Sequence, residues 1–261
     1  MKLPEGHHIP YRLGIALSGG GARGFAHLGA LKAIEDLGLK PDIVAGVSAG
    51  SVVAACYGSG MTSADVLDMF HSLRFRDFIE LIVPHEGFFR LSRFKHLLEH
   101  RLPIKNLEDM KVPTVVCATE LDAGIKVAFT SGPAAERIIA SCSIPIVFEP
   151  VEIDGQRYVD GGVLANLPVW PIRHLCKYVI GVNCSPRYVQ PPAKSIVGMA
   201  QRTYALMTKN NVTQDSEMCD VVVNLTDVAT HQVSDLKDIE LLVESGYLTT
   251  IRTLKQSRIL G

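Results

Sequence analysis

The 261-residue sequence lacks several features that assign proteins to a class directly. No apolar run approaches the roughly 18 residues needed to cross a bilayer, and residues 1–10 lack the basic-then-apolar layout of a signal peptide. The net charge is only -1, so nothing favours a nucleic-acid partner. No Pro-, Gly- or Ser-rich linker divides the chain. We therefore expect one cytoplasmic domain over 1–261, whose 47% hydrophobic residues suffice for a large core.

The sequence also lacks close cysteine pairs and clusters of metal-binding residues. Its six cysteines are scattered through expected strands and helices, which is typical of reduced core residues. Neither a disulfide framework nor a zinc site is expected, and no cofactor is required. The six are Cys56, Cys117, Cys142, Cys176, Cys184 and Cys219.

The pattern most suggestive of chemistry is Gly46-Val47-Ser48-Ala49-Gly50, which ends an apolar run and precedes small apolar residues. This order predicts a buried strand, a sharp turn and a buried helix, with the serine at the apex. Such a turn strains the serine backbone, so its neighbours must lack bulk, as Gly46 and Gly50 do. Ser48 is our candidate nucleophile; the alternative is a capping serine in a tight turn.

A second candidate site is the loop Ser18-Gly19-Gly20-Gly21-Ala22-Arg23-Gly24, which precedes an expected helix at 25–37. Its glycines leave backbone N–H groups unblocked at a helix N-terminus, where anions bind. The spacing also fits a dinucleotide-binding loop, which needs an acidic residue at the end of the second strand. Asp42 lies at the beginning of that strand. An oxyanion hole beside Ser48 therefore explains the glycines better, and Arg23 would hold the loop or pair with a lipid phosphate.

Strands are expected to alternate with helices along most of the chain. This alternation predicts an α/β sandwich with a mainly parallel central sheet. An Asp154-Gly155 turn predicts a hairpin whose return strand delivers Asp160-Gly161-Gly162. The expected strands are 12–17, 42–47, 114–119, 125–130, 146–153, 156–159, 177–183 and 220–225, and the expected helices after residue 40 are 51–56, 134–142, 195–210 and 236–256.

The segment from Met61 to Arg101 contains six of the nine phenylalanines, interleaved with arginine and lysine. It predicts helical fragments broken near Pro84 and Gly87. The simpler interpretation is a helical layer that packs its phenylalanines on the sheet. The alternative is a cap over the active site whose basic, aromatic rim contacts a lipid surface. Both can hold together.

Three motifs in order, the glycine loop, the Ser48 turn and Asp160-Gly161-Gly162 followed by Asn166, resemble those of the patatin-like phospholipases, especially compact bacterial members. The resemblance covers about 12–225. It implies a three-layer α/β/α fold and a lipid acyl hydrolase with a Ser-Asp dyad.

On that resemblance Ser48 is the nucleophile and Asp160 its base, and the backbone of Gly19, Gly20 and Gly21 forms the oxyanion hole. Gly161 and Gly162 would let the Asp160 carboxylate approach closely. The expected partner is a lipid or acyl ester, with peripheral membrane contact through about 61–101.

The residues leave other mechanisms open. A carboxylate is a weak base unless burial raises its pKa, and Asp160 could instead cap the amides of a turn. His174 or His231 follows Asp160 and could complete a Ser-Asp-His triad. A non-catalytic regulator that keeps the fold is a further alternative.

Overall fold

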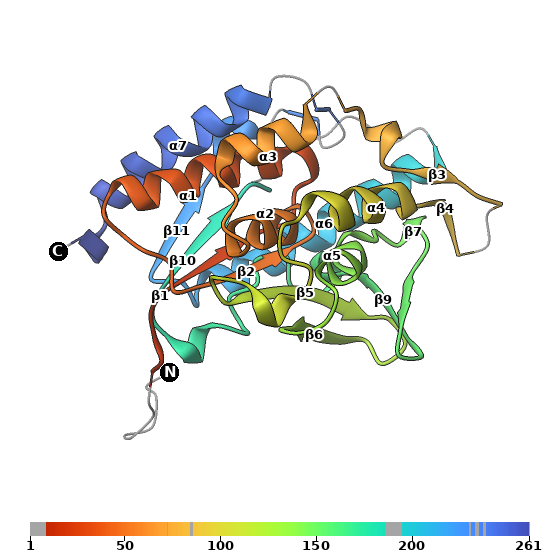
Figure 1. Ribbon diagram of the computed structural model, residues 1–261, viewed down its shortest axis with the longest axis horizontal. Coiled ribbons are helices and arrows are strands. Elements are labelled where there is room, and N and C mark those ends of the chain that lie inside the picture. The colour runs from red at the N-terminus through yellow and green to blue at the C-terminus, as the bar shows by residue number, and fades with distance from the viewer. Residues whose placement is uncertain are drawn as a thin grey trace.

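The computed structural model of the chain describes residues 9–71, 73–83, 86–185, 195–229, 231–232, 235–236 and 239–260. A sheet of eight strands lies at its centre, in the order β11-β10-β1-β2-β5-β9-β8 (Figure 1). Strands β2 and β9 pair with successive parts of one edge of β5, and β6 pairs with the opposite edge of β5. The strands of this sheet are β1 (Tyr11–Leu17), β2 (Ile43–Val47), β5 (Thr114–Glu120), β6 (Ile125–Phe129), β8 (Val151–Ile153), β9 (Gln156–Asp160), β10 (Cys176–Asn183) and β11 (Val221–Asn224). A smaller sheet joins β3 (Glu80–Leu81), β4 (Gly87–Arg90) and β7 (Ile146–Phe148).

The α/β sandwich with a central sheet is confirmed, although the sheet is mixed. Strands β11, β10, β1, β2 and β5 pair in parallel, while β6, β8 and β9 are antiparallel to their neighbours. Strands β1, β2, β5 and β10 consist mostly of buried residues, largely apolar, as expected for strands covered on both faces. Parallel strands place their carboxyl ends at one edge of a sheet, which is where ligand sites form.

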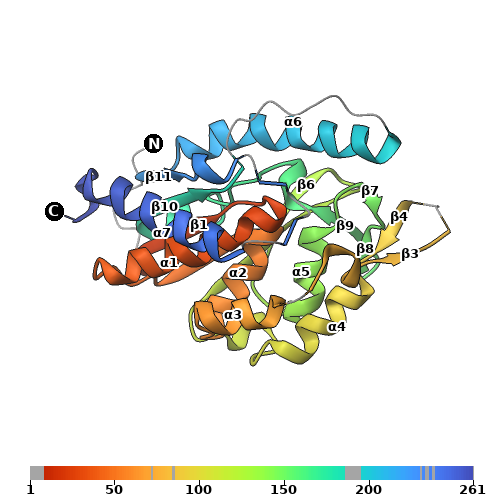
Figure 2. The same ribbon diagram turned by 90° about the horizontal axis from the view of Figure 1, so that it is seen from above.

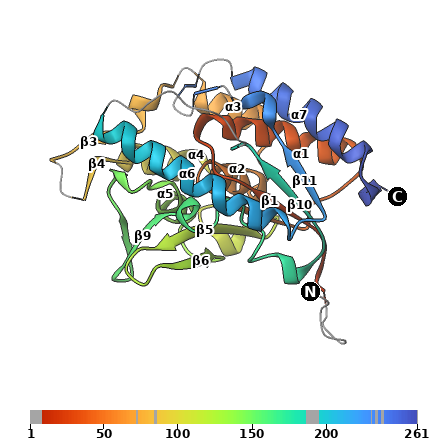
Figure 3. The same ribbon diagram turned by 180° about the vertical axis from the view of Figure 1, so that it is seen from behind.

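Helices cover both faces of the sheet, as Figure 2 shows. Helices α1, α2, α5 and α7 pack on one face, with α3 and α4 outside them, and α6 lies alone on the other. Figure 3 presents the α6 side. The helices are α1 (Ala26–Asp36), α2 (Ala49–Gly58), α3 (Ser63–Phe70), α4 (Ser92–Arg101), α5 (Ala134–Cys142), α6 (Ile196–Ser216) and α7 (Ile239–Lys255). None of the described helices is both long and apolar enough to span a membrane.

Two expectations on strands and helices need correction. The strand expected over 146–153 is divided, because Pro150 supplies no N–H for a ladder; β7 joins the small sheet, and β8 forms the hairpin with β9. The turn itself is confirmed, since Asp154 and Gly155 both have positive φ, at 52° and 77°. Helix α6 extends to Ser216, six residues beyond the expected end.

The segment 61–101 combines helices with the short strands β3 and β4, so the prediction of helical fragments alone was incomplete. The break expected near Pro84 lies outside the described residues. Phe70, Phe78 and Phe94 are buried and pack against one another in edge-to-face and tilted contacts, with ring centroids 5.1–6.3 Å apart. These three rings therefore belong to a packed helical layer, in agreement with the simpler interpretation. One domain over 1–261 stays a prediction.

Helices α1 and α7, on the same face of the sheet, pack with their backbones in close contact. A Cβ at Gly29 would lie 1.8 Å from the Val243 carbonyl oxygen, and one at Gly246 would lie 2.0 Å from the Ala26 carbonyl oxygen. These distances are far below van der Waals contact, so both positions require glycine for the two backbones to approach.

Gly29→Ala and Gly246→Ala should each lower the free energy of unfolding by about 1–3 kcal/mol, because the added methyl meets backbone that cannot move independently. Urea denaturation measures this change. Leu248→Ala, on the exposed side of α7, is the control and should change it by less than about 0.5 kcal/mol. Equal effects at all three positions would contradict the close-packing argument.

Candidate active site

Ser48 lies at the sharp turn between β2 and α2, with φ 53° and ψ -124°. A positive φ is uncommon for a residue other than glycine and marks a strained position. Hydrogen bonds hold it there: the Ser48 N–H donates to Ser141 Oγ at 2.8 Å, and the Ser51 N–H donates to the Ser48 carbonyl at 2.9 Å. The flanking glycines are required as expected, because a Cβ at Gly46 would lie 2.2 Å from the Gly50 carbonyl oxygen.

The sheet register brings Asp160 next to this turn. On one edge of β5, β2 pairs along 114–117 and ends with Val47 opposite Cys117. Strand β9 takes up the remainder of the same edge and ends with Asp160 opposite Ala118. The two strands therefore meet end to end along β5, and Ser48 follows one of them where Asp160 ends the other.

The Asp160 carboxylate is fully buried, and only one of its two oxygens has hydrogen-bond partners among the described residues. Its Oδ1 accepts hydrogen bonds from the Gly162 N–H and the Tyr204 hydroxyl, both at 2.8 Å. Its Oδ2 has no hydrogen-bond partner among the described residues. Burial raises the pKa of Asp160 to about 6, although the Gly162 N–H and the Ser48 and Tyr204 hydroxyls each lower it. The Ser48 hydroxyl thus lies near enough to stabilise the charged carboxylate without completing a hydrogen bond.

The glycine loop follows β1 and lies beside Ser48: a Cβ at Gly19 would be 3.1 Å from Ser48 Cβ. The Gly19 N–H is already donated to the Asn166 carbonyl at 3.2 Å. No hydrogen bond from the N–H of Gly20 or Gly21 to another described residue is found. Of the three glycines expected to form an oxyanion hole, Gly20 and Gly21 are therefore the two whose N–H groups have no partner among the described residues.

Two buried side chains hold that loop. Arg23 Nε donates to the Gly20 carbonyl at 3.3 Å, and His27 Nε2 lies 2.8 Å from the Ser18 carbonyl oxygen. At the opposite end of the strands, the Asp42 carboxylate accepts the Leu13 N–H at 2.8 Å. Asp42 therefore cannot hold the ribose of a nucleotide at this loop, in agreement with the preference against a dinucleotide site.

A cavity of about 710 Å³ opens over Ser48 and the glycine loop. One part of its wall is apolar and comes largely from α2, α3, α4 and β7. It includes Val53, Phe70, Phe94 and Phe148. The other part is polar and comes from the glycine loop, α6 and the segment before α7. An apolar cavity with a few convergent polar groups is typical of small-molecule sites.

The two histidines considered as alternatives differ in position. His174 is exposed and precedes β10, at the end of the parallel strands opposite to Ser48. His231 lines the cavity, but its Nε2 lies 2.8 Å from the Asp235 carbonyl oxygen. Neither Asp160 oxygen is hydrogen-bonded to a histidine among the described residues.

Residues on α6 complete the site, and the sequence analysis did not identify them. Tyr204 contacts the Asp160 carboxylate, and Asn211 donates from Nδ2 to the Gly162 carbonyl at 2.8 Å. Asp215 accepts the Leu167 N–H at 3.3 Å. The spacing 204, 208, 211 and 215 places four polar residues on one helical face, a pattern that could have drawn attention to them.

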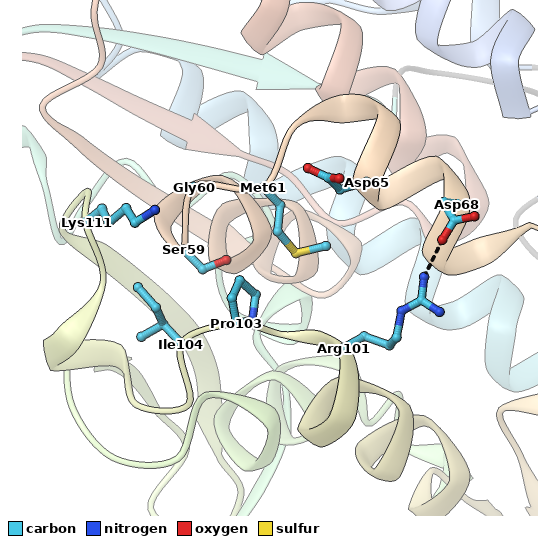
Figure 4. Close-up of a pocket in the computed structure, with 9 residues that line it drawn as sticks. All are labelled: Ser59, Gly60, Met61, Asp65, Asp68, Arg101, Pro103, Ile104 and Lys111. Atoms are coloured by element: carbon cyan, nitrogen blue, oxygen red, sulfur yellow. Dashed lines mark hydrogen bonds and ion pairs between the residues drawn. The ribbon is translucent and has the colours of Figure 1, made fainter.

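A second hollow, of about 420 Å³, lies at the other end of α2, ten residues or more from Ser48 along the chain. Figure 4 shows Arg101 turned toward Asp68, to which it is ion-paired at 2.6 Å. The Asp65 carboxylate there accepts the N–H and hydroxyl of Thr62 at the start of α3. Within the described parts of the chain, no group of three or more His, Cys, Asp or Glu residues could hold a metal ion.

Comparison with known proteins points to one family. A sequence model of the family described as patatin-like phospholipase matches residues 15–172. An NTE family protein of Mycobacterium bovis is 36% identical over 168 residues, which are 62% of this chain and 45% of that protein. The neuropathy target esterase of Drosophila persimilis is 30% identical over 164 residues, 60% of this chain and 11% of that protein. The chain thus spans less than half the length of these relatives.

A solved structure agrees with the fold. VipD from Legionella pneumophila superposes with a TM-score of 0.53 over 95% of this chain and 67% of its own, at 15% sequence identity. At that identity the similarity concerns the fold alone.

Ser141→Ala should lower the free energy of unfolding by about 1–3 kcal/mol, because it leaves the buried Ser48 N–H without an acceptor. It should also slow labelling of Ser48 by a fluorophosphonate, since the turn loses its anchor. Ser59→Ala is the matched control: that hydroxyl is also buried, but donates to the Cys56 carbonyl of its own helix. Unchanged stability and labelling in Ser141→Ala would contradict this role.

Proposed function

Because the chain belongs to the patatin-like phospholipase family, we propose that it is a serine acyl hydrolase that cleaves carboxylic ester bonds of lipids. The observation that carries the proposal is the pairing of a strained, cavity-facing Ser48 with the free, buried Oδ2 of Asp160. A serine hydroxyl becomes an effective nucleophile only when a neighbouring base takes its proton. A carboxyl group with a pKa of about 6 is ionised near neutral pH and basic enough to do so.

The reaction proceeds through an acyl-enzyme. Asp160 takes the proton of the Ser48 hydroxyl as its Oγ forms a bond to the ester carbonyl carbon. The Gly20 and Gly21 N–H groups stabilise the resulting oxyanion, and each such donor contributes roughly 3 kcal/mol. The tetrahedral intermediate breaks its C–O bond, and the leaving alcohol takes the proton from Asp160. Water then attacks the acyl carbon while Asp160 takes its proton. The bond between that carbon and Ser48 Oγ breaks, Oγ takes the proton back from Asp160, and the fatty acid is released.

The cavity supports a lipid as the substrate class. Its apolar part matches an acyl chain, while Arg23 and the α6 side offer polar and cationic groups to the remainder of the molecule. The name of the Drosophila relative, an esterase, agrees with ester cleavage. A triad with His231 and a non-catalytic regulator stay as alternatives; the unpaired carboxylate oxygen favours the dyad over both.

We also propose contact with a membrane surface, at a site narrower than the whole of 61–101. Among the described residues of that segment, the large exposed apolar side chains are Leu81 and Val83, which are 75% and 89% exposed, in and just after β3. In Figures 1 and 2 the strands β3 and β4 lie at one end of the molecule. Exposed Ile146 and Ile196 come from neighbouring β7 and α6. The protein would be cytoplasmic and bind lipid reversibly.

Ser48→Ala and Asp160→Asn should each reduce hydrolysis of p-nitrophenyl butyrate by at least about a thousandfold, because they remove the nucleophile or the base. Asp160→Asn should melt no lower than the parent at pH 8, since the amide oxygen can still accept from Gly162 and Tyr204.

His231→Ala is the control for this pair and should keep most activity. If it loses as much activity as Asp160→Asn, the reaction uses a triad. Full activity in a folded Asp160→Asn variant would exclude the dyad.

Replacing Leu81 and Val83 together by serine should weaken sedimentation with phosphatidylglycerol vesicles, because less apolar surface is buried at the interface. Activity on soluble p-nitrophenyl butyrate should stay within twofold. Leu248→Ser, on the exposed face of α7, is the control for lost surface hydrophobicity. Equal vesicle binding by the double variant and the parent would exclude this contact.

A further inference from the structure

The inner face of α6 touches the candidate base directly. Tyr204, on α6, donates its hydroxyl hydrogen to Asp160 Oδ1 at 2.8 Å. One of the two Asp160 oxygens is thereby occupied, while Oδ2 has no partner among the described residues. The contact therefore selects which oxygen is free to receive a proton.

The contact between Tyr204 and Asp160 requires glycine at position 162. A Cβ at Gly162 would lie 2.1 Å from the Tyr204 hydroxyl oxygen, so any larger residue would displace the phenol. The Gly162 N–H meanwhile donates to the same Oδ1. Gly162 thus contributes in two ways to the hydrogen bonds at Asp160 Oδ1: its own N–H is one donor, and its lack of a side chain leaves room for the other, the Tyr204 hydroxyl.

Helix α6 is tied to the same loop at two further points. Asn211 donates to the Gly162 carbonyl at 2.8 Å and accepts the Asn166 N–H at 3.0 Å. Residues 204 and 211 are two turns apart and lie on one helical face. The helix is consequently held in register with the loop, so that the Tyr204 hydroxyl has a fixed position relative to Asp160.

We infer that Tyr204 is a positioning residue for the reaction: its hydroxyl holds the Asp160 carboxylate so that Oδ2 faces the Ser48 hydroxyl. This inference rests on the Ser-Asp dyad proposed above. The patatin-like motifs themselves do not include the tyrosine, which lies 44 residues beyond Asp160 on a separate helix.

The surroundings of Asp160 keep Tyr204 protonated, so that it donates a hydrogen bond to the carboxylate. Within the part of the chain that the structure describes, the titratable groups that interact with Asp160 are Tyr204 from α6 and Cys142 from the end of α5. Burial raises the pKa of both, and the Asp160 charge raises them further, so both stay protonated near neutral pH. Tyr204 is therefore a hydrogen-bond donor throughout, and its loss removes a group that lowers the pKa of Asp160.

The test compares the pH dependence of kcat/KM for p-nitrophenyl butyrate in the parent and in Tyr204→Phe. Asp160 must be ionised to act as a base, so parent activity should fall as the pH falls through about 6. Tyr204→Phe should move this acid limb upward by about one pH unit, which is typical for a lost hydrogen bond to a charged group. The loss in kcat/KM at pH 6 should exceed the loss at pH 9 by about fivefold. A loss of more than about twofold should remain at pH 9, where Asp160 is ionised in both proteins but is no longer held with Oδ2 facing Ser48.

Tyr57→Phe is the matched control, because the Tyr57 hydroxyl also donates to a carboxylate, that of Glu35, at 2.8 Å but far from the site. Its acid limb should coincide with that of the parent. A Tyr204→Phe variant that matches the parent at pH 9, or that melts lower without moving the limb, would overturn the positioning role. An unchanged profile would overturn it as well.

Failure of the dyad gives a different result. If a folded Asp160→Asn variant remains active, the base is not Asp160 and the proposed function is wrong before Tyr204 is considered. If Asp160→Asn is inactive and the Tyr204→Phe limb does not move, the dyad stands and only the role of Tyr204 is excluded.

Discussion

The structure of the site depends on one buried carboxylate with an unsatisfied oxygen. Desolvation of a charged carboxyl group is costly, and proteins normally compensate it with hydrogen bonds or an ion pair. Asp160 receives two donors on Oδ1, while its Oδ2 has no partner among the described residues. The fold thereby retains a group that is less stable than it could be, which is common at catalytic sites.

Several elements converge to maintain this arrangement. Strand β5 carries β2 and β9 on the same edge, so the serine turn and the aspartate meet where the two strands end. The glycine loop is tied to the segment after Asp160 through Gly19 and Asn166. Helix α6 contacts Asp160 through Tyr204 and the following loop through Asn211. Ser48 and Asp160 are therefore held by contacts from elements that are distant in the sequence.

Local patterns were sufficient to predict much of this arrangement. The Gly-x-Ser-x-Gly turn, the glycine loop and the Asp154-Gly155 hairpin are short-range features, in which the residue types determine the backbone conformation directly. Sheet order and the antiparallel placement of β9 depend on contacts between distant residues, which no local pattern encodes. The polar face of α6 could be recognised from its spacing, but its partner could not: Tyr204 meets Asp160 only when α6 packs on a loop that lies 44 residues earlier.

The central claim is that Ser48 carries the acyl group during turnover. Acid quenching of the enzyme during hydrolysis of a p-nitrophenyl ester, followed by peptide mass spectrometry, tests this directly. The peptide containing Ser48 should gain the mass of the acyl group less one proton, and Ser48→Ala should give no adduct. Acylation at another residue, or steady turnover by Ser48→Ala at the parental rate, would contradict the account.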